Sequence, residues 1–188
     1  MDLLERAIVF ATEKHCGQVR KMAKTPYILH PLEVATVIST MTSDKELLAA
    51  GVLHDTVEDT DTTIEEIRDV FGKNVSLLVM TETEDKREDR PPADTWELRK
   101  EETLLILKNT TDIRVKMLWL GDKLSNMRSF AREYRKKGDD VWSSLNQKDP
   151  AKQAWYYKSI AEGLKELSHY DAYREYMALV NEVFKDYL

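Results

Sequence analysis

The stretch LLAAGVLHDTVEDTD, residues 47–61, joins an apolar run to a cluster of one histidine and several carboxylates. Its apolar first half predicts a buried helix, so the charged residues that follow lie at the end of that helix. On a continued helix His54 shares a face with Glu58, and Asp55 shares the next face with Asp59. One pair can then face a metal ion while the other faces water or substrate. A solvated acidic helix end is the alternative interpretation.

Two further residues in apolar segments are candidate metal ligands. His30 stands in YILHPL, and Asp122 stands in VKMLWLGDKLSNMR. An aspartate within such an apolar helix is costly to bury unless it is paired or binds a metal. The alternatives are a core histidine without a ligand role at position 30, and a structural ion pair of Asp122 with Lys123 or Arg128.

Together His30, His54, Asp55 and Asp122 offer two imidazoles and two carboxylates. This mixed nitrogen and oxygen set suits Mn²⁺, Fe²⁺, Co²⁺ or Zn²⁺ better than Ca²⁺ or Mg²⁺. The absence of thiolate ligands argues against a closed structural zinc site. On a metal that accepts six ligands, four protein ligands would leave coordination positions for water and a phosphate oxygen, as metal-assisted hydrolysis requires.

Most of the remaining chain also predicts helix, and its six glycines and five prolines favour long helices over a turn-rich β architecture. Ser43 and Thr63, each followed three residues later by glutamate, indicate helix starts. Asp112 is expected to cap a long helix that ends at Gly138. The helices are predicted over residues 2–15, 31–41, 44–57, 64–72, 73–83, 95–108, 112–137, 150 to about 167, and about 172–188.

We therefore expect one all-α domain, a helical bundle over residues 1–188. The motif-bearing region spans about 1–135, and further helices span about 150–188. Residues 84–93, EDKREDRPPA, predict a surface loop because they are highly polar and carry two prolines. Lys86 or Arg87 in this loop could reach an anionic substrate, although a solvated loop is the simpler interpretation.

Composition restricts the class of protein. With 42% hydrophobic and 33% charged residues, the chain has an ordinary globular balance, and its net charge of −6 argues against a general nucleic-acid binder. The single cysteine, Cys16, cannot form an internal disulfide. No apolar run approaches the ~20 residues of a membrane span, and the N-terminus does not resemble a signal peptide. We expect a cytoplasmic protein without a membrane partner; its oligomeric state is left open.

The candidate ligands lie in segments that resemble the HD superfamily. Within it the sequence is similar to the hydrolase domain of RelA/SpoT-type alarmone enzymes, and in size to the small stand-alone alarmone hydrolases. The resemblance extends over about the first two thirds of the chain and is carried, in the family's order, by GQVRK (17–21), PYILHPLEVA (26–35), LHDTVEDT (53–60) and GDKLSNMR (121–128).

The resemblance implies a role for each matching residue. His30, His54, Asp55 and Asp122 would ligate one divalent ion, most simply Mn²⁺. Glu58 and Asp59 match the family's catalytic acidic pair, which positions or deprotonates the attacking water; the sequence does not distinguish which is the base. The residues that match or suggest substrate contacts are Arg20 and Lys21 near the nucleotide base, Asn126 near the ribose, and Tyr156 as a stacking aromatic.

Three of these four substrate contacts have a simpler alternative. Arg20 and Lys21 could be a solvated basic loop, and Tyr156 an ordinary core aromatic. The sequence also departs from the usual family pattern at residues 22–24, which read MAK, and at Ser125, where the family usually has histidine. Both departures fall near the expected nucleotide position.

Three functions remain in competition. The first is hydrolysis of the 3′-pyrophosphate of guanosine tetra- or pentaphosphate (ppGpp or pppGpp), giving GDP or GTP and pyrophosphate. The second is an HD phosphohydrolase that acts on another nucleotide or on NADPH. The third is a non-catalytic domain that senses a metal or nucleotide. The acidic pair Glu58 and Asp59 favours an enzyme, because a sensor has no need of it beside the metal ligands.

Overall fold

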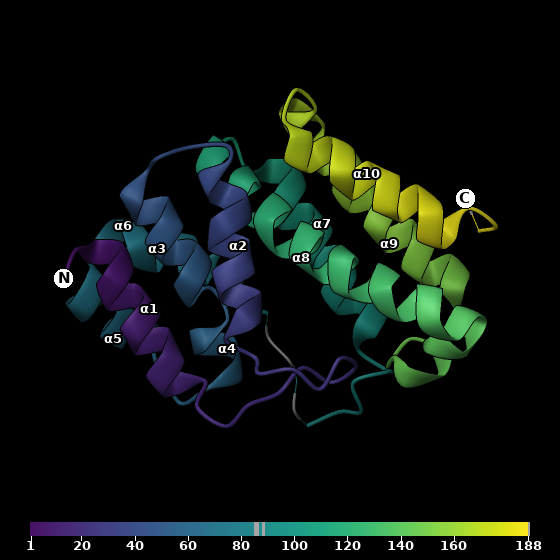
Figure 1. Cartoon of the computed structure of the whole chain (residues 1–188), viewed down its shortest axis with the longest axis horizontal. Helices are drawn as coiled ribbons and strands as arrows, with labels where there is room; N and C mark the ends of the chain where they lie inside the picture. Colours follow the sequence, from purple (N-terminus) through teal and green to yellow (C-terminus); the bar gives the residue numbers. More distant parts are fainter. Residues whose placement is uncertain (85–86, 88, 188) are drawn as a thin grey trace. The chain divides into compact units, whose positions relative to one another are not determined.

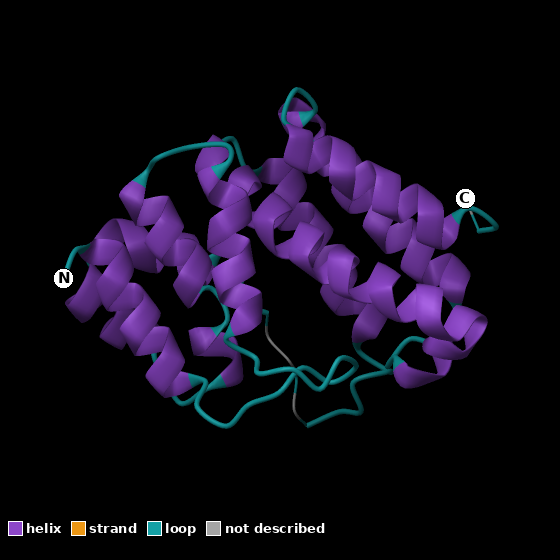
Figure 2. Cartoon of the chain, in the orientation of Figure 1, coloured by secondary structure: helices purple, strands orange, loops and turns teal. Residues whose placement is uncertain are grey.

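The computed structural model describes residues 1–84, 87 and 89–187, and its regular elements are helices (Figure 1). No strand is present in this part of the chain, as the helical ribbons and loops of Figure 2 show. Extended backbone pairs at the isolated bridge between Val19 and Pro26. The predicted all-α fold class is confirmed.

The described chain divides into two compact units. Unit 1 comprises Met1–Thr83 and Asp112–Ser125. Its central helix α3 packs against α1, α2 and α6, and α5 packs against α6 (Figure 1). The helices of unit 1 are α1 (Leu3–Lys14), α2 (Leu29–Ser39), α3 (Lys45–Leu53), α4 (Thr56–Asp59), α5 (Ile64–Phe71), α6 (Lys73–Met80) and the first part of α8 (Ile113–Lys137).

Two glycines allow the helices of unit 1 to approach one another closely. A Cβ atom on Gly51 of α3 would lie 2.6 Å from Ile38 Cδ1 of α2. On α8, a Cβ atom on Gly121 would lie 3.0 Å from Ile38 Cγ1 and 3.2 Å from a methyl group of Val34. Helices α3 and α8 can therefore pack directly on α2. This packing brings His54, at the end of α3, and Asp122, on α8, toward His30.

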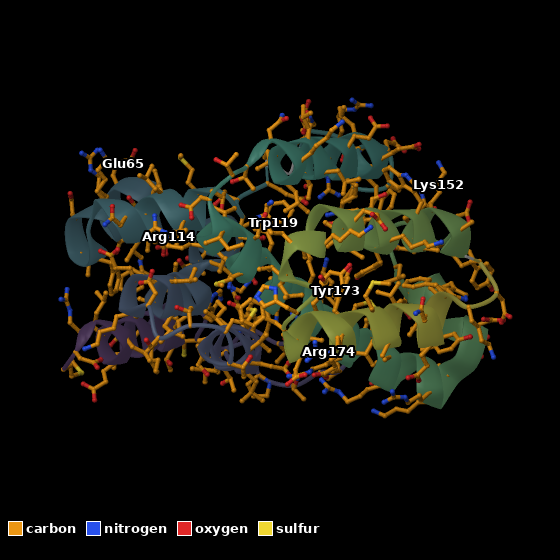
Figure 3. The ribbon with its side chains drawn as sticks, turned by 90° about the horizontal axis from the view of Figure 1, so that it is seen from above. Glu65, Arg114, Trp119, Lys152, Tyr173 and Arg174 are labelled. Atoms are coloured by element: carbon orange, nitrogen blue, oxygen red, sulfur yellow. The ribbon has the colours of Figure 1, made fainter. Side chains whose placement is uncertain are left out.

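Unit 2 comprises Glu84–Thr111 and Asn126–Leu188, of which residues 85, 86, 88 and 188 are not described. In this unit α9 packs against α7 and α10. The hydroxyl of Tyr173 on α10, labelled in Figure 3, donates a hydrogen bond of 3.1 Å to the carbonyl of Ala161 on α9. The helices are α7 (Trp96–Asn109), the second part of α8, the 3₁₀ helix η1 (Gly138–Ser144), α9 (Pro150–Gly163), the 3₁₀ helix η2 (Lys165–Leu167) and α10 (Asp171–Phe184).

The predicted helix starts are largely confirmed. Thr63 accepts a hydrogen bond of 3.1 Å from the backbone N–H of Glu66, and Asp112 accepts one of 2.9 Å from that of Arg114. The predicted cap at Ser43 is wrong by one residue. Asp44 caps α3 instead, because its carboxylate reaches backbone N–H groups in the first turn.

The polar segment 84–93 contains no helix among its described residues, as predicted. Arg87 forms an ion pair of 2.6 Å with Glu102, and both residues belong to unit 2. Lys86, the other basic residue that was considered for a substrate contact, lies outside the described residues.

Among the described helices, none combines the length and the apolar character needed to cross a membrane.

Candidate metal centre

Four side chains from three parts of unit 1 converge on one buried point. His30 lies in the first turn of α2, His54 and Asp55 lie between α3 and α4, and Asp122 lies on α8. Asp122 Oδ1 is 3.1 Å from His30 Nε2 and 3.6 Å from His54 Nε2. Asp55 Oδ2 is 3.4 Å from His30 Nε2 and 3.1 Å from His54 Nε2. The four residues predicted from the sequence are therefore brought together.

The arrangement fits a metal ion. His30, His54 and Asp122 are all buried, and one ligand atom from each lies within 4.8 Å of the others, so they could hold a divalent metal. Nε2 of His54 is buried and, although it lies close to Asp55, makes no hydrogen bond to any described residue. A buried nitrogen without a hydrogen bond is costly unless another partner, such as a metal, takes its lone pair.

A break in the helix allows adjacent residues to reach the same point. The sequence predicted a helix continuing to about Val57, but α3 ends at Leu53 and α4 begins at Thr56. Neighbouring side chains on a regular helix point in directions about 100° apart. His54 and Asp55 form the turn between the two helices, and both side chains reach the centre. The expected division into two faces, one for each i, i+4 pair, is therefore wrong for these two residues.

The pKa values of the cluster reflect its mutual attractions. Burial would lower the pKa of His54, but the carboxylates of Asp55 and Asp122 outweigh it and raise that pKa well above 6.5. Burial would likewise raise the pKa values of both carboxyl groups. The imidazoles of His54 and His30 nevertheless hold the pKa of Asp55 well below 3.8. The ammonium group of Lys123, together with the same imidazoles, does the same for the pKa of Asp122. The centre thus keeps negative oxygens that favour a cation.

Asp122 also contacts Lys123, as the alternative interpretation expected. Arg128, the other basic residue considered for that pairing, forms an ion pair of 2.6 Å with Glu175 within unit 2. The Lys123 ammonium group extends the cluster further, because its Nζ lies 3.7 Å from Oε2 of Glu82. Asp122 thus contacts the two histidines through Oδ1 and Lys123 through Oδ2.

Glu82 is an additional buried carboxyl group of unit 1. Its side chain is only 4% exposed. Burial raises its pKa to about 8, and the negative charges of Asp122 and Asp55 act in the same direction against the attraction of Lys123. No signal in the sequence pointed to this residue, because Glu82 was expected at the end of an ordinary helix.

The acidic pair lies on α4, next to the metal cluster. The hydroxyl of Tyr27 is 2.7 Å from Asp55 Oδ2 and 2.8 Å from Asp59 Oδ2, so one phenol touches a candidate ligand and one member of the acidic pair. Gln18 donates a hydrogen bond of 2.7 Å to the backbone carbonyl of Asp59. Glu58 is partly exposed on the same short helix.

Tyr27 was not predicted as a site residue. Burial raises the pKa of its hydroxyl far above 10.0, and the charges of Asp55 and Asp59 and the hydrogen bonds to both act in the same direction. The phenol therefore keeps its proton. The available signal was its place in the segment PYILHPLEVA (26–35), three residues before His30.

The predicted substrate-binding residues belong to both units. Arg20 and Lys21 lie in unit 1, where the Arg20 guanidinium is 5.7 Å from the centre of the Tyr27 ring and Lys21 is exposed. Asn126 and Tyr156 belong to unit 2. Tyr156 is 5% exposed, and its ring contacts Trp96 and lies 5.0 Å from Lys100 Nζ.

Comparison with known proteins identifies the family. A family model described as HD domain matches residues 7–151. The chain is 42% identical over 137 residues to a guanosine-3′,5′-bis(diphosphate) 3′-pyrophosphohydrolase of Aquifex aeolicus, covering 71% of this chain and 19% of that protein. It is 35% identical over 131 residues to a GTP pyrophosphokinase of Myxococcus xanthus, covering 69% and 17%. The chain therefore spans less than a fifth of these two relatives.

Solved structures resemble the chain over much more of their length. One is described by the words "A metazoan ortholog of SpoT hydrolyzes ppGpp and plays a role in starvation responses". It has a TM-score of 0.73 and 25% identity, with 100% of this chain and 98% of that chain covered. Another, lmo0812 from Listeria monocytogenes EGD-e, has a TM-score of 0.72 and 33% identity, with 85% and 96% covered. With the family model matching most of its residues, the chain belongs to the HD domain family.

Proposed function

We propose that this chain is a metal-dependent phosphohydrolase that removes the 3′-pyrophosphate of ppGpp or pppGpp. The observation that carries the proposal is the convergence of His30, His54, Asp55 and Asp122 at a buried point beside the acidic helix α4. Support for the substrate comes from the relative named a guanosine-3′,5′-bis(diphosphate) 3′-pyrophosphohydrolase and from the solved SpoT ortholog that hydrolyzes ppGpp.

In this proposal, the four converging residues hold one divalent ion. Their two imidazoles and two carboxylates suit Mn²⁺, Fe²⁺, Co²⁺ or Zn²⁺, and we favour Mn²⁺ from the family resemblance. When bound, the ion supplies positive charge that polarises a phosphoryl oxygen and favours attack on phosphorus. Both histidines offer Nε2 toward the carboxylates, which is the nitrogen available for such an ion.

The acidic pair handles the proton of the attacking water. Glu58 is the proposed base: it accepts a proton from water while the water oxygen forms a bond to the phosphorus attached to the 3′ oxygen. The bond between that phosphorus and the 3′ oxygen breaks, and the 3′ oxygen takes up a proton. The products are pyrophosphate and GDP or GTP. Asp59, held through Tyr27 and Gln18, is proposed to orient the water or the leaving oxygen.

Substrate binding needs local positive charge in a chain with a net charge of −6. We propose that Arg20 and Lys21 contact the nucleotide, with Arg20 already placed near the Tyr27 ring. Contacts of Asn126 with the ribose and of Tyr156 with the base remain predictions from the resemblance. A cytoplasmic location, and a small-molecule nucleotide rather than nucleic acid as the partner, also remain predictions from the sequence.

A substrate panel tests this function. Purified protein with Mn²⁺ is incubated with ppGpp, GTP, NADPH and nucleoside monophosphates, and pyrophosphate release is followed. We expect release from ppGpp, with kcat about 10²- to 10⁴-fold lower in Glu58→Gln at unchanged metal content. Glu65→Gln, on the exposed first turn of α5, is the matched control and is expected to retain full activity.

The other outcomes redirect the assignment. Turnover of NADPH or another nucleotide, with ppGpp left intact, would keep the metal-dependent hydrolase and overturn the substrate. Metal binding without turnover of any tested compound would favour a sensing domain.

A further inference from the structure

A chain of hydrogen bonds behind the candidate metal centre links Glu33, Ser125 and His30. The hydroxyl of Ser125 lies 2.6 Å from Glu33 Oε2 and 2.8 Å from His30 Nδ1. Ser125 is 1% exposed and His30 is 4% exposed, so the contact between them is shielded from water. His30 and Glu33 come from one turn of α2, whereas Ser125 comes from α8, and all three belong to unit 1 (Figure 1).

The chemistry of these groups fixes the direction of each hydrogen bond. A carboxylate only accepts hydrogen bonds, and a serine hydroxyl has one proton to donate. The hydroxyl of Ser125 therefore donates to Glu33. Its oxygen is then left to accept from the ring of His30, which places an N–H at Nδ1. This tautomer leaves the lone pair of His30 on Nε2, the atom that lies 3.1 Å from Asp122 Oδ1.

His54 reaches the same tautomer by a different route. Its Nδ1 lies 2.9 Å from the backbone carbonyl of Gly51, which can only accept, so the proton is again on Nδ1. A backbone carbonyl within α3 is fixed by the helix. The partner of His30 is instead the hydroxyl of Ser125, which is polarised by the carboxylate of Glu33. The strength of the hydrogen bond to His30 therefore depends on both of these residues.

We infer that Glu33 and Ser125 are positioning residues that hold His30 in the Nδ1–H tautomer and present its Nε2 to the metal. The inference rests on the proposed metal site. Hydrogen bonding of the outer nitrogen orients a ligating imidazole and raises its basicity, and loss of such partners typically lowers metal affinity 10- to 100-fold. Neither residue need touch the metal or the substrate to act in this way.

Metal affinity of the metal-free protein provides the first test. Dissociation constants for Mn²⁺ and Zn²⁺ are measured by competition with a chromophoric chelator. We expect Ser125→Ala to weaken binding about 10- to 100-fold, and Glu33→Gln, which keeps an acceptor oxygen but loses the charge, to weaken it less. Ser125→Thr restores the hydroxyl and is expected to restore affinity. Ser76→Ala is the matched control, and it is expected to leave the affinity unchanged. It also removes a buried serine hydroxyl, but one that is bonded to the backbone carbonyl of Lys73.

Nitrogen-15 NMR of the histidine rings in the Zn²⁺-loaded protein provides the second test. Wild type is expected to show a slowly exchanging proton on His30 Nδ1, and Ser125→Ala to lose its protection from exchange while the corresponding His54 signal persists. A proton on His30 Nε2, or unchanged affinity and unchanged proton exchange in both Ser125→Ala and Glu33→Gln, would overturn the inference. Should Ser125→Ala fail to fold, Glu33→Gln carries both measurements.

His54→Ala separates this inference from the proposed function. If His54→Ala abolishes metal binding while Ser125→Ala and Glu33→Gln have no effect, the positioning role is overturned and the metal site stands. If His54→Ala also binds metal as wild type does, the metal site itself is overturned, and the positioning role with it.

Discussion

The hydroxyl of Tyr27 and the carboxylate of Asp59 lie 2.8 Å apart, and the same hydroxyl lies 2.7 Å from Asp55. The phenol lies within hydrogen-bond distance of both acids and, having a single proton, donates to one of the two carboxylates at a time. Tyr27 thereby connects a candidate metal ligand to the proposed catalytic pair. Both acids are partly shielded from water, so water replaces the phenol poorly as a hydrogen-bond donor. Removal of the hydroxyl is therefore costly.

Replacing Tyr27 by phenylalanine is expected to misplace Asp59, whereas Asp55 keeps its contacts with His30 and His54 and so stays in position. We predict that kcat for ppGpp falls about 10- to 100-fold, the range expected when a catalytic group shifts by about 1 Å. KM and bound metal are expected to change little. Steady-state kinetics and metal analysis measure these effects. Tyr173→Phe, which removes a hydroxyl bonded to a backbone carbonyl in unit 2, serves as the control. Equal kcat in both variants would contradict a role for Tyr27.

His54→Ala and Asp122→Ala are each predicted to remove metal and activity together. Each change deletes a donor atom at the buried point where the candidate ligands converge. Metal content measured by elemental analysis after dialysis should fall from near one equivalent to a small fraction, and activity should fall in parallel. His169→Ala, on an exposed residue of unit 2, should keep both. Full metal occupancy in the two site variants would refute the ligand assignment.

Arg20→Ala is predicted to raise KM for a polyphosphate nucleotide more than it changes fold stability. The guanidinium belongs to a loop residue and lies near the Tyr27 ring rather than in the apolar core, so its loss should disturb little of the packing. Loss of a charge-assisted contact with a phosphate corresponds to about 1.5–3 kcal/mol, or roughly 10- to 100-fold in KM. Kinetics and thermal unfolding are compared with those of Lys45→Ala, which removes another exposed cation of unit 1. An unchanged KM would place Arg20 outside the site.

Asp112 is predicted to stabilise the start of α8 in a pH-dependent manner. Its carboxylate accepts from the backbone N–H of Arg114, and hydrogen bonds from the Arg114 side chain, labelled in Figure 3, hold its pKa below 3.8. Asp112→Ala should therefore cost about 1 kcal/mol, the usual effect of losing a helix cap.

The pH dependence follows from the lowered pKa of Asp112. Because the folded value is the lower one, the charge contributes stability above pH 3.8 and loses it as the pH falls through the folded value. Asp112→Asn keeps a capping oxygen and removes only the charge. Denaturant unfolding should find the Asp112→Asn variant less stable than wild type at neutral pH, with a smaller difference between the two below pH 3.8. A difference that does not shrink in acid would contradict the assignment.

The local elements of the fold could be predicted because they depend on short-range chemistry. Thr63 and Asp112 each mark a helix start through a hydrogen bond to a residue two or three positions later. The apolar run before His54 forms a buried helix, as expected. Boundaries that depend on competition between neighbours were less accurate. Ser43 and Asp44 can both cap a helix, and the structure selects Asp44, whose carboxylate reaches two backbone N–H groups.

The sequence by itself determined the all-α class and, through the spacing of its motifs, the four candidate ligands His30, His54, Asp55 and Asp122. These follow from residue type and apolar context, which are local properties. Only the tertiary structure placed Glu33, Ser125, Tyr27 and Glu82 around them, because their partners are separated by many residues and meet only when the helices of unit 1 pack. A serine or a tyrosine carries no sign of its partner in the sequence. Its hydrogen bonds are decided by which helix lies against it, and here Gly51 and Gly121 permit that close packing.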